Sequence, residues 1–443
     1  MDRKSLTTLA VGAIAAAGLA GASSANAAFD AGNVANNVLT ITGDNGSDVI
    51  ALHLKAGDPN TLILDPGDDE SGNVTEFDRT QFDRIVVNAG GGKDEIRIDD
   101  SNGVFTDTEA TTINGDAGPD LILGGGGGET LNGGADDDTV SGRGGNDTMT
   151  GDTGNDRLRG GPGVDPQNGG AGNDEILWIP GDGNDVIEGQ AGTDKMLFNG
   201  ANIAENFDVS ANGGRVRFTR NIANIVMDLN DVEAIDLKAL GGADNLVVND
   251  LSGTDLTSVN PDLAAGGGGD DAQPDNVIAN ATNGSDVVVV AGNGPTPTIS
   301  GLSARISVSG AIAGSDRITV NALAGDDVVD ASGLAANSAL LTINGGDGDD
   351  VLIGGSGPDT ILGGAGDDVI IGGPGADTLD GGTGDNVVID TANATAVRSA
   401  AVVGKSWLKS HARTVRGRTV LTVDGQKTKL PRAKLAKLVR AVS

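Results

Sequence analysis

The chain has 443 residues, of which 73 are glycine and none is cysteine or tyrosine, and its net charge is −34. The absence of cysteine excludes a disulfide scaffold, a cysteine-ligated metal and a cysteine nucleophile, and two histidines leave little material for a histidine metal cage. This negative charge disfavours nucleic acid and anionic membranes as partners and favours cations. With 2% aromatic but 37% hydrophobic residues, the composition predicts many narrow strands rather than a broad globular core.

The first 27 residues are typical of a secretory signal. A positively charged start precedes an apolar run at residues 9–20, and Ala25-Asn26-Ala27 supplies the small-residue cleavage pattern. A membrane anchor is the alternative interpretation, but the apolar run is short for a bilayer span. We therefore expect a secreted, extracellular protein whose mature chain begins at Ala28 and contains no transmembrane span.

A nine-residue repeat is the strongest signal in the chain. Its pattern is G-G-x-G-x-D-x-U-x, where U is a large apolar residue, and seven consecutive units start at Gly115. Two more units follow a two-residue slip at Trp178-Ile179, and a second block of five units starts at Gly345. The sixth position is acidic in every unit except the last, where it is Asn386. These acids are Asp120, Glu129, Asp138, Asp147, Asp156, Asp165, Asp174, Asp185, Asp194, Asp350, Asp359, Asp368 and Asp377.

Each unit predicts a glycine-rich turn of six residues followed by a strand of three. Side chains alternate along a strand, so position eight points inward, from Ile122 in the first block to Val388 in the second. Two units make one coil, and equivalent turns therefore stack 18 residues apart. One edge of the stack then carries a row of acids that includes Asp120 and Asp138, and the other edge carries the row that includes Glu129 and Asp147.

Such rows of acids predict a calcium-binding function. Like charges about 4.8 Å apart, the distance between strands, repel unless a cation lies between them. Carboxylates and backbone carbonyls are hard oxygen ligands that select calcium over metals preferring sulfur, and magnesium suits such carbonyl cages less. We expect the thirteen acids to hold several calcium ions, about eight if each ion bridges turns two units apart. A metal-free glycine-rich solenoid or a solvated disordered acidic run is the alternative.

Departures from the pattern predict weaker sites. Glu129 and Asn386 replace the ligand aspartate, and Asp136 replaces the fourth-position glycine. Pro166-Gln167 is expected to spoil a strand. Because metal binding supplies folding free energy, we expect the blocks to be loose without calcium and to fold when calcium binds.

A longer, weaker repeat lies outside the blocks. The pattern I-x-[VL]-x-A-x-x-G-x-D occurs at residues 85–94, 235–244 and 318–327, and Asn-Gly-Ser-Asp occurs at 45–48 and 283–286. The order of these segments predicts a duplicated half, residues 38–197 and 199–390. Turn closing is the preferred role for the aspartates of these loops, and calcium ligation is the alternative. They are Asp48, Asp94, Asp244, Asp286 and Asp327.

The predicted organisation follows from these boundaries. It comprises a signal at 1–27, a β-solenoid region at 28–114, a calcium-binding block at 115–197, an intermediate β-solenoid region at 198–344, a second block at 345–390 and a basic tail at 391–443. The Val/Ile-rich segments between the blocks are expected to form coils of a wider parallel β-helix without metal.

The tail contains 12 Lys or Arg residues and one acid. Residues 420–423 and 427–430 flank Asp424-Gly425, which is typical of a hairpin. Pro431 can open a helix, and Leu435, Leu438 and Val442 then follow helical spacing. We favour a small cap that docks on the acidic solenoid and closes its final coil. The other interpretation is a surface-binding helix drawn to anionic lipid, a glycan or cell-wall polymer.

The nonapeptide blocks resemble the RTX, or haemolysin-type, calcium-binding repeats of secreted bacterial proteins, which include toxins, proteases, lipases, alginate epimerases, adhesins and surface-layer proteins. The resemblance covers residues 115–197 and 345–390, under a third of the chain. It implies a parallel β-roll in which sixth-position acids and backbone carbonyls of adjacent turns hold calcium. Many such proteins carry a C-terminal secretion signal, whereas this chain has an N-terminal signal and a basic tail, which favours export by the general pathway.

The catalytic motifs of the enzymatic relatives are missing, since His53 and His411 stand alone and no G-x-S-x-G elbow occurs. We therefore expect an all-β, non-enzymatic protein, a parallel β-helix or β-roll with a structural or adhesive role at the cell surface or in the matrix. The alternative is a carbohydrate-active enzyme, a lyase, epimerase or glycosidase, that uses carboxylates on a β-helix. Trp178 and Trp407 are too few for a convincing sugar-stacking platform.

Overall fold

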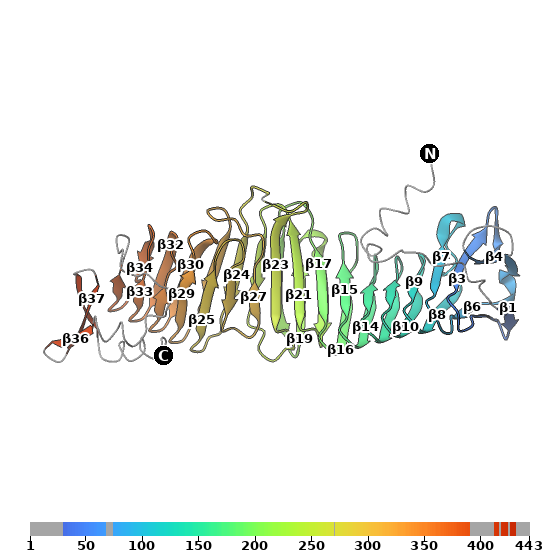
Figure 1. The fold of residues 1–443 in the computed structure, drawn as a ribbon, viewed down its shortest axis with the longest axis horizontal. Coiled ribbons are helices and arrows are strands. Elements are labelled where there is room, and N and C mark those ends of the chain that lie inside the picture. Colours follow the sequence, from blue (N-terminus) through green and yellow to red (C-terminus); the bar gives the residue numbers. More distant parts are fainter. Residues whose placement is uncertain are drawn as a thin grey trace.

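A computed structural model describes residues 30–67, 74–269 and 271–389, together with the backbone of 412–415, 418–423 and 426–430. The predicted signal at 1–27 and the predicted helix after Pro431 lie outside the described residues. Most of the described chain winds into one elongated rod of short strands (Figure 1). None of the helices in the described part is long and apolar enough to cross a bilayer.

The rod is a parallel β-solenoid with two long faces, sheet A and sheet B. Sheet A contains β1 (Asp30–Ala35), β2 (Val38–Thr42), β6 (Arg84–Asn88), β8 (Ala110–Ala117), β10 (Glu129–Ala135), β12 (Thr148–Thr153), β14 (Pro166–Ala171), β16 (Val186–Ala191), β18 (Asn206–Asn212), β19 (Arg215–Arg220), β20 (Ile225–Asn230), β22 (Asn245–Val248), β24 (Asn276–Asn280), β28 (Arg317–Asn321), β30 (Leu340–Asp347), β32 (Asp359–Ala365) and β34 (Thr378–Asp380).

Sheet B contains β3 (Val49–Lys55), β4 (Asp58–Pro66), β5 (Thr75–Asp78), β7 (Glu95–Asp99), β9 (Leu121–Leu123), β11 (Thr139–Ser141), β13 (Arg157–Arg159), β15 (Glu175–Trp178), β17 (Lys195–Asn199), β21 (Ala234–Leu240), β23 (Ser258–Ala265), β25 (Val287–Gly292), β26 (Thr298–Ser300), β27 (Arg305–Ser307), β29 (Val328–Leu334), β31 (Val351–Ile353), β33 (Val369–Ile371) and β35 (Val387–Ile389). Three short 3-10 turns, η2 (Arg79–Gln81), η3 (Asp100–Asn102) and η4 (Ile222–Asn224), lie between strands.

Strand register confirms the predicted 18-residue coil. In sheet A, Thr130 of β10 pairs in parallel with Thr148 of β12, and in sheet B, Val140 of β11 pairs in parallel with Leu158 of β13. The parallel ladders continue through the intermediate region by way of pairs such as β17–β21, β24–β28 and β28–β30. The fold is therefore the all-β solenoid that the repeat period predicts.

Position-eight side chains fill the interior, as predicted for a strand with one inward face. Ile122, Leu158 and Ile361 are completely buried. Val388 is the exception: it is 42% exposed because β35 is the last strand of the described ladder. The prediction that Pro166-Gln167 spoils a strand is wrong, since β14 is intact and Gln167 is buried, with its Nε2 donating to Asp185 Oδ2 at 3.2 Å.

Aromatic rings fill the interior near the middle of the rod. Trp178 stacks on Phe198 with ring centroids 4.0 Å apart, and Phe218 contacts Phe198 at 4.6 Å. Arg220 lies 5.3 Å above the Trp178 ring and forms an ion pair with the fully buried carboxylate of Glu205. The two-residue slip at Trp178-Ile179 therefore lies where the core changes from aliphatic to aromatic.

Antiparallel excursions leave the ladder at corresponding places in the two predicted halves. Strands β3–β4–β5 follow the Asn-Gly-Ser-Asp turn that ends at Asp48, and β25–β26–β27 follow the equivalent turn that ends at Asp286. At the N-terminal end, β1 runs antiparallel to β2, so both sheets begin with an antiparallel strand. This correspondence supports the duplicated half.

The predicted tail hairpin is confirmed in its strands. β37 (Arg418–Val423) pairs antiparallel with β38 (Gln426–Leu430), with Val423 opposite Gln426, and β36 (Ala412–Val415) adds a third strand. The predicted turn residues Asp424-Gly425 lie outside the described residues.

Replacing Arg220 with Met should destabilise the protein strongly, because the carboxylate of Glu205 would remain buried without its cation. The expected loss is about 3–5 kcal/mol of unfolding free energy in calcium. Arg215→Met is the matched control, since Arg215 forms partly exposed ion pairs with Glu188 and Asp228 that contribute about 0–1 kcal/mol. Denaturant unfolding checks the difference, and equal losses in the two variants would contradict the buried-pair argument.

Candidate metal centre

The sixth-position acids line the two long edges of the solenoid. We call the turns that lead from sheet A to sheet B the AB edge and the turns that lead from sheet B to sheet A the BA edge. The AB edge carries Asp120, Asp138, Asp156, Asp174, Asp194, Asp350 and Asp368, and the BA edge carries Glu129, Asp147, Asp165, Asp185, Asp359 and Asp377. All of them are buried except Asp377, which is half-buried.

One hydrogen bond repeats along both edges. Along most of each edge, the backbone N–H of an acid donates to a side-chain oxygen of the residue one coil further on, as from Asp120 to Asp138 at 2.7 Å and from Asp138 to Asp156 at 2.8 Å. On the BA edge, Asp147 donates in the same way to Asp165 at 2.8 Å. The bond fixes each carboxylate beside its neighbour at the spacing of the strands.

The second carboxylate oxygen has a different environment. In Asp138, Asp156 and Asp174 the Oδ2 atom is buried and has no hydrogen-bond partner in the described part of the chain. The same holds for the other carboxylates of this group, Asp120 Oδ2, Glu129 Oε1, Asp147 Oδ2, Asp165 Oδ2 and Asp194 Oδ2. Buried polar atoms are seldom left unpaired, so a regular series of unpaired acceptors fits a row of cation ligands.

Backbone carbonyls approach these unpaired oxygens. A Cβ atom added to Gly133 would lie 2.5 Å from Asp138 Oδ2 and 2.9 Å from the carbonyl oxygen of Gly151 in the next coil. The bare side of the glycine therefore faces one carboxylate oxygen and one carbonyl oxygen. An environment made only of oxygen acceptors fits a hard cation such as calcium, with carbonyls supplying part of the shell.

The turn conformation explains the glycine pattern. In most units, residues at positions two and four have left-handed backbones, such as Gly134 with φ of 119° and Gly145 with φ of 111°. Asp136, which replaces a fourth-position glycine, has φ of 79° and keeps the same turn. The predicted weakness at Asp136 is therefore not a break in the backbone.

The two substituted sixth positions behave differently. Glu129 keeps an oxygen with no partner and accepts from Gly125 N–H at 2.9 Å, so its longer side chain still places a carboxylate in the column. Asn386 accepts from Asp368 N–H at 2.7 Å, but its amide group donates to the carbonyl of Gly381. Asn386 thus continues the hydrogen-bond ladder without adding a charge.

The isolated loops belong to the same columns, which the fixed nine-residue spacing concealed. Along the AB edge, the backbone N–H of Asp48 donates to Asp94 Oδ1 and that of Asp94 donates to Asp120 Oδ1, both at 2.7 Å. The backbone N–H of Asp327 donates to Asp350 Oδ1 at 2.9 Å. The loops are separated from their neighbours by insertions of irregular length. The signal that could have found them is the shorter pattern [GA]-x-x-G-x-D, present at residues 43–48, 89–94 and 322–327.

The loop aspartates form two groups, which differ in what their second carboxylate oxygen contacts. Asp48 and Asp286, at the start of each half, use their second oxygen to accept from Asp44 N–H at 3.2 Å and Thr282 N–H at 2.9 Å. Turn closing is therefore confirmed for both. Asp94, Asp244 and Asp327 instead keep a buried Oδ2 with no partner, as the nonapeptide acids do.

Burial and mutual repulsion raise the pKa of carboxyl groups in the columns. Burial, together with the charges of Asp120 and Asp156 on either side, raises the pKa of Asp138 to about 8. Burial likewise raises the pKa of Asp94 to about 7 and of Asp185 to about 8. These carboxylates are costly to ionise in the folded chain unless a cation neutralises them.

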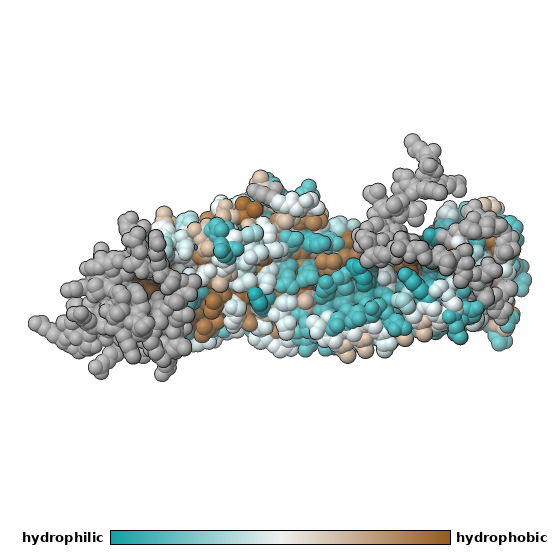
Figure 2. Space-filling model, in the orientation of Figure 1, coloured by the Kyte–Doolittle hydropathy of each residue, from teal (hydrophilic) through white to brown (hydrophobic). Residues whose placement is uncertain are grey.

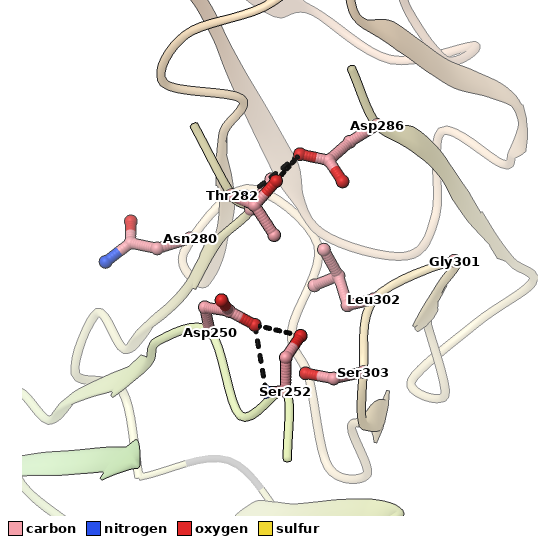
Figure 3. A pocket seen from close by; sticks show the side chains of 9 residues that line it. Asp250, Ser252, Asn280, Thr282, Asp286, Gly301, Leu302 and Ser303 are labelled. Carbon is pink, nitrogen blue, oxygen red and sulfur yellow. Dashed lines mark hydrogen bonds between the residues drawn. The ribbon is translucent and has the colours of Figure 1, made fainter. Parts of the chain in front are cut away.

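A polar pocket lies at the surface of the intermediate region (Figure 3). Asp250 accepts from the backbone and hydroxyl of Ser252, and Asp286 accepts from the backbone and hydroxyl of Thr282. Both carboxylates thus hold their own turns. Throughout the described residues, the columns included, no three His, Cys, Asp or Glu side chains converge as a metal cluster, so any site in the columns needs carbonyl ligands.

Comparison with known families agrees with this geometry. The family of the RTX calcium-binding nonapeptide repeat (4 copies) matches residues 105–140, 141–176, 181–202, 342–361 and 353–388. A search of curated proteins gave no match to the chain. The molecule is a parallel β-solenoid with acidic turn columns, and it carries RTX calcium-binding repeats. It is therefore a calcium-binding repeat protein.

Stability of the calcium-free protein should fall as pH rises. These carboxyl groups have a pKa of about 6 to 8 in the folded chain, against an ordinary 3.8, so the folded state binds more protons across that interval. Without calcium, the fold should be more stable at pH 5 than at pH 8. Circular dichroism melts in chelator check this, and a melting temperature that rises with pH would contradict it.

Calcium binding should have the opposite dependence on pH from the stability of the calcium-free protein. Because calcium binds the ionised carboxylates, its affinity should rise as pH rises through about 6 to 8, and binding should release protons. Calorimetry in two buffers of different ionisation enthalpy measures the proton release directly.

Proposed function

We propose that this protein is a secreted, non-enzymatic solenoid whose folding calcium controls, with a structural or adhesive role outside the cell. The observation that carries the proposal is the row of buried carboxylate oxygens without hydrogen-bond partners along both edges. The chemistry of these oxygens suits calcium, and RTX repeats are typical of secreted proteins. An extracellular setting is also where weak calcium sites can fill.

The proposed ligands are the thirteen sixth-position acids, assisted by carbonyls of the neighbouring turns. Asp94, Asp244 and Asp327 join them, because they share the unpaired buried oxygen. In acids whose second oxygen is unpaired, such as Asp138 and Asp156, Oδ1 accepts from the backbone N–H of the neighbouring coil, which leaves Oδ2 for the ion. Calcium supplies positive charge between carboxylates that otherwise repel, and this neutralisation stabilises the stacked turns.

Part of the rod has a stabilising network that needs no metal. In the intermediate region an asparagine ladder runs from Asn249 through Asn280 and Asn321 to Asn344, with amide hydrogen bonds of 2.9, 2.8 and 2.6 Å. Neutral amides can stack at strand spacing without repulsion. Calcium should therefore control the two nonapeptide blocks more strongly than the segment between them.

The non-enzymatic part of the proposal rests on the sites described above. Trp178 is buried in the core, where it cannot stack on a sugar, and the carboxylates of the polar pocket are engaged by their own turns. A carbohydrate-active enzyme would need an acid pair free to face a substrate. Product analysis with purified polysaccharides in calcium tests this part, and any turnover would overturn it.

Replacing Asp156 with Asn should weaken calcium binding, because Asn keeps an oxygen acceptor for the ladder but loses the charge. At least one site should lose about 1.4 kcal/mol or more, a tenfold change in affinity. Asp137→Asn is the matched control, since Asp137 lies beside the same edge and is exposed. Calorimetric titration measures both variants. Equal affinities and ion numbers in Asp156→Asn, the control and the parent would contradict the ligand assignment.

Removing calcium should open the two blocks before the segment between them. With chelator, hydrogen exchange at 115–197 and 345–389 should accelerate by orders of magnitude, while 245–344 should retain more protection. Hydrogen-exchange mass spectrometry with and without calcium resolves the segments. A uniform change along the rod, or none, would argue against metal control of the blocks, and a magnesium sample provides the control for general charge screening.

A further inference from the structure

The outward face of sheet B changes character along the rod. In the first block its outward positions include polar or charged residues such as Thr139, Arg157 and Glu175. In the second block every outward position is Val or Ile, and we call these six residues the valine–isoleucine face: Val351, Ile353, Val369, Ile371, Val387 and Ile389. Figure 2 shows hydrophilic residues over the middle of the rod and hydrophobic patches nearer its C-terminal end.

One file of valines shows that this face is covered. Register places Val287, Val328, Val351, Val369 and Val387 directly beside one another along sheet B. Val287 is 54% exposed, whereas the last three members are 2%, 1% and 6% exposed. Side chains in one file share their orientation and spacing. The difference in exposure therefore needs a cover over β31, β33 and β35.

The main strand contacts of β33 are with β31, β32 and β35, which are its neighbours in the coil and not a layer over the face. Ile370 belongs to the interior cluster, but Val369 and Val387 do not. The inward-facing Val388 of the last coil is nevertheless 42% exposed. The covered surface is thus the side of the rod and not its open end.

We propose that the valine–isoleucine face is the docking surface of the C-terminal segment 432–442 of the same chain. The described solenoid ends on this face at Ile389, and the following tail is long enough to fold back. The segment has an apolar stripe at helical spacing that includes Leu435, Leu438 and Val442. An apolar helix face on an apolar sheet face buries both from water.

Charge favours the same arrangement. Exposed Asp349 and Asp385 run along the AB edge beside the face, joined through Asp367 by backbone-to-carboxylate hydrogen bonds. The segment carries basic residues on either side of its apolar stripe, namely Arg432, Lys434, Lys437 and Arg440. Docking on the side of the rod replaces the expected cap on the final coil, and it does not depend on which residues bind calcium.

The absence of cysteine from the chain makes a direct test possible. A full-length variant with Val369→Cys and Leu438→Cys should form an intramolecular disulfide under mild oxidation in calcium. Thr360→Cys with Leu438→Cys is the matched control, because Thr360 faces outward from sheet A in the same coil. Non-reducing electrophoresis should show crosslinking at least about tenfold faster for the Val369 pair, since docking raises the local concentration of the two thiols.

Three outcomes overturn the proposal: equal rates in the two pairs, no intramolecular crosslink in either, or linked dimers from the Val369 pair, which would place a second copy on the face. Circular dichroism confirms folding of each variant, and Ile371→Cys replaces Val369→Cys if that variant loses β-structure. Calorimetric calcium titration of the same proteins separates a failure of docking from a failure of the proposed calcium function.

Discussion

The backbone N–H that donates to a carboxylate one coil away is the interaction on which this structure depends. It satisfies a donor that the turn would otherwise bury unpaired, and it fixes the register of successive coils. It also places carboxylates side by side at strand spacing, in a setting where burial and the neighbouring carboxylates raise the pKa of Asp138 to about 8. The geometry that stacks the turns therefore creates the charge that a cation must neutralise. Folding and ligand binding are two aspects of one arrangement.

The rod combines two solutions to the problem of stacking polar residues. Aspartate columns need a cation or bound protons to neutralise their charge. The side chains of the ladder from Asn249 to Asn344 are neutral amides that hydrogen-bond to one another, so they need neither. The aromatic core around Trp178 and Phe198 adds apolar stabilisation between the blocks. Under the proposed function, such a rod would respond to calcium in segments while its middle maintains the alignment of the two ends.

The period of the repeat was sufficient to predict the solenoid, the 18-residue coil and the inward residues such as Leu158. Sequence spacing failed where insertions intervene, so Asp94 and Asp327 looked like isolated loops although they continue the same columns. Gln167 stands where the repeat has a large apolar residue, which led to the wrong prediction of a spoiled strand. The carboxylate of Asp185 accepts a hydrogen bond from its amide inside the coil. The valine–isoleucine face could not be recognised from the sequence, because a three-residue strand does not show which residues of other strands lie beside it. Only the strand register shows that Val351, Val369 and Val387 form one row.

The antiparallel strands at the start of both sheets give the rod two unlike ends. A parallel ladder offers an edge onto which further coils, from this chain or another, could add without limit. Here β1 and β5 run against the direction of the coils, so the hydrogen-bonding pattern they offer does not match that of a following coil. The addition of further parallel coils is therefore disfavoured at the edges that β1 and β5 form.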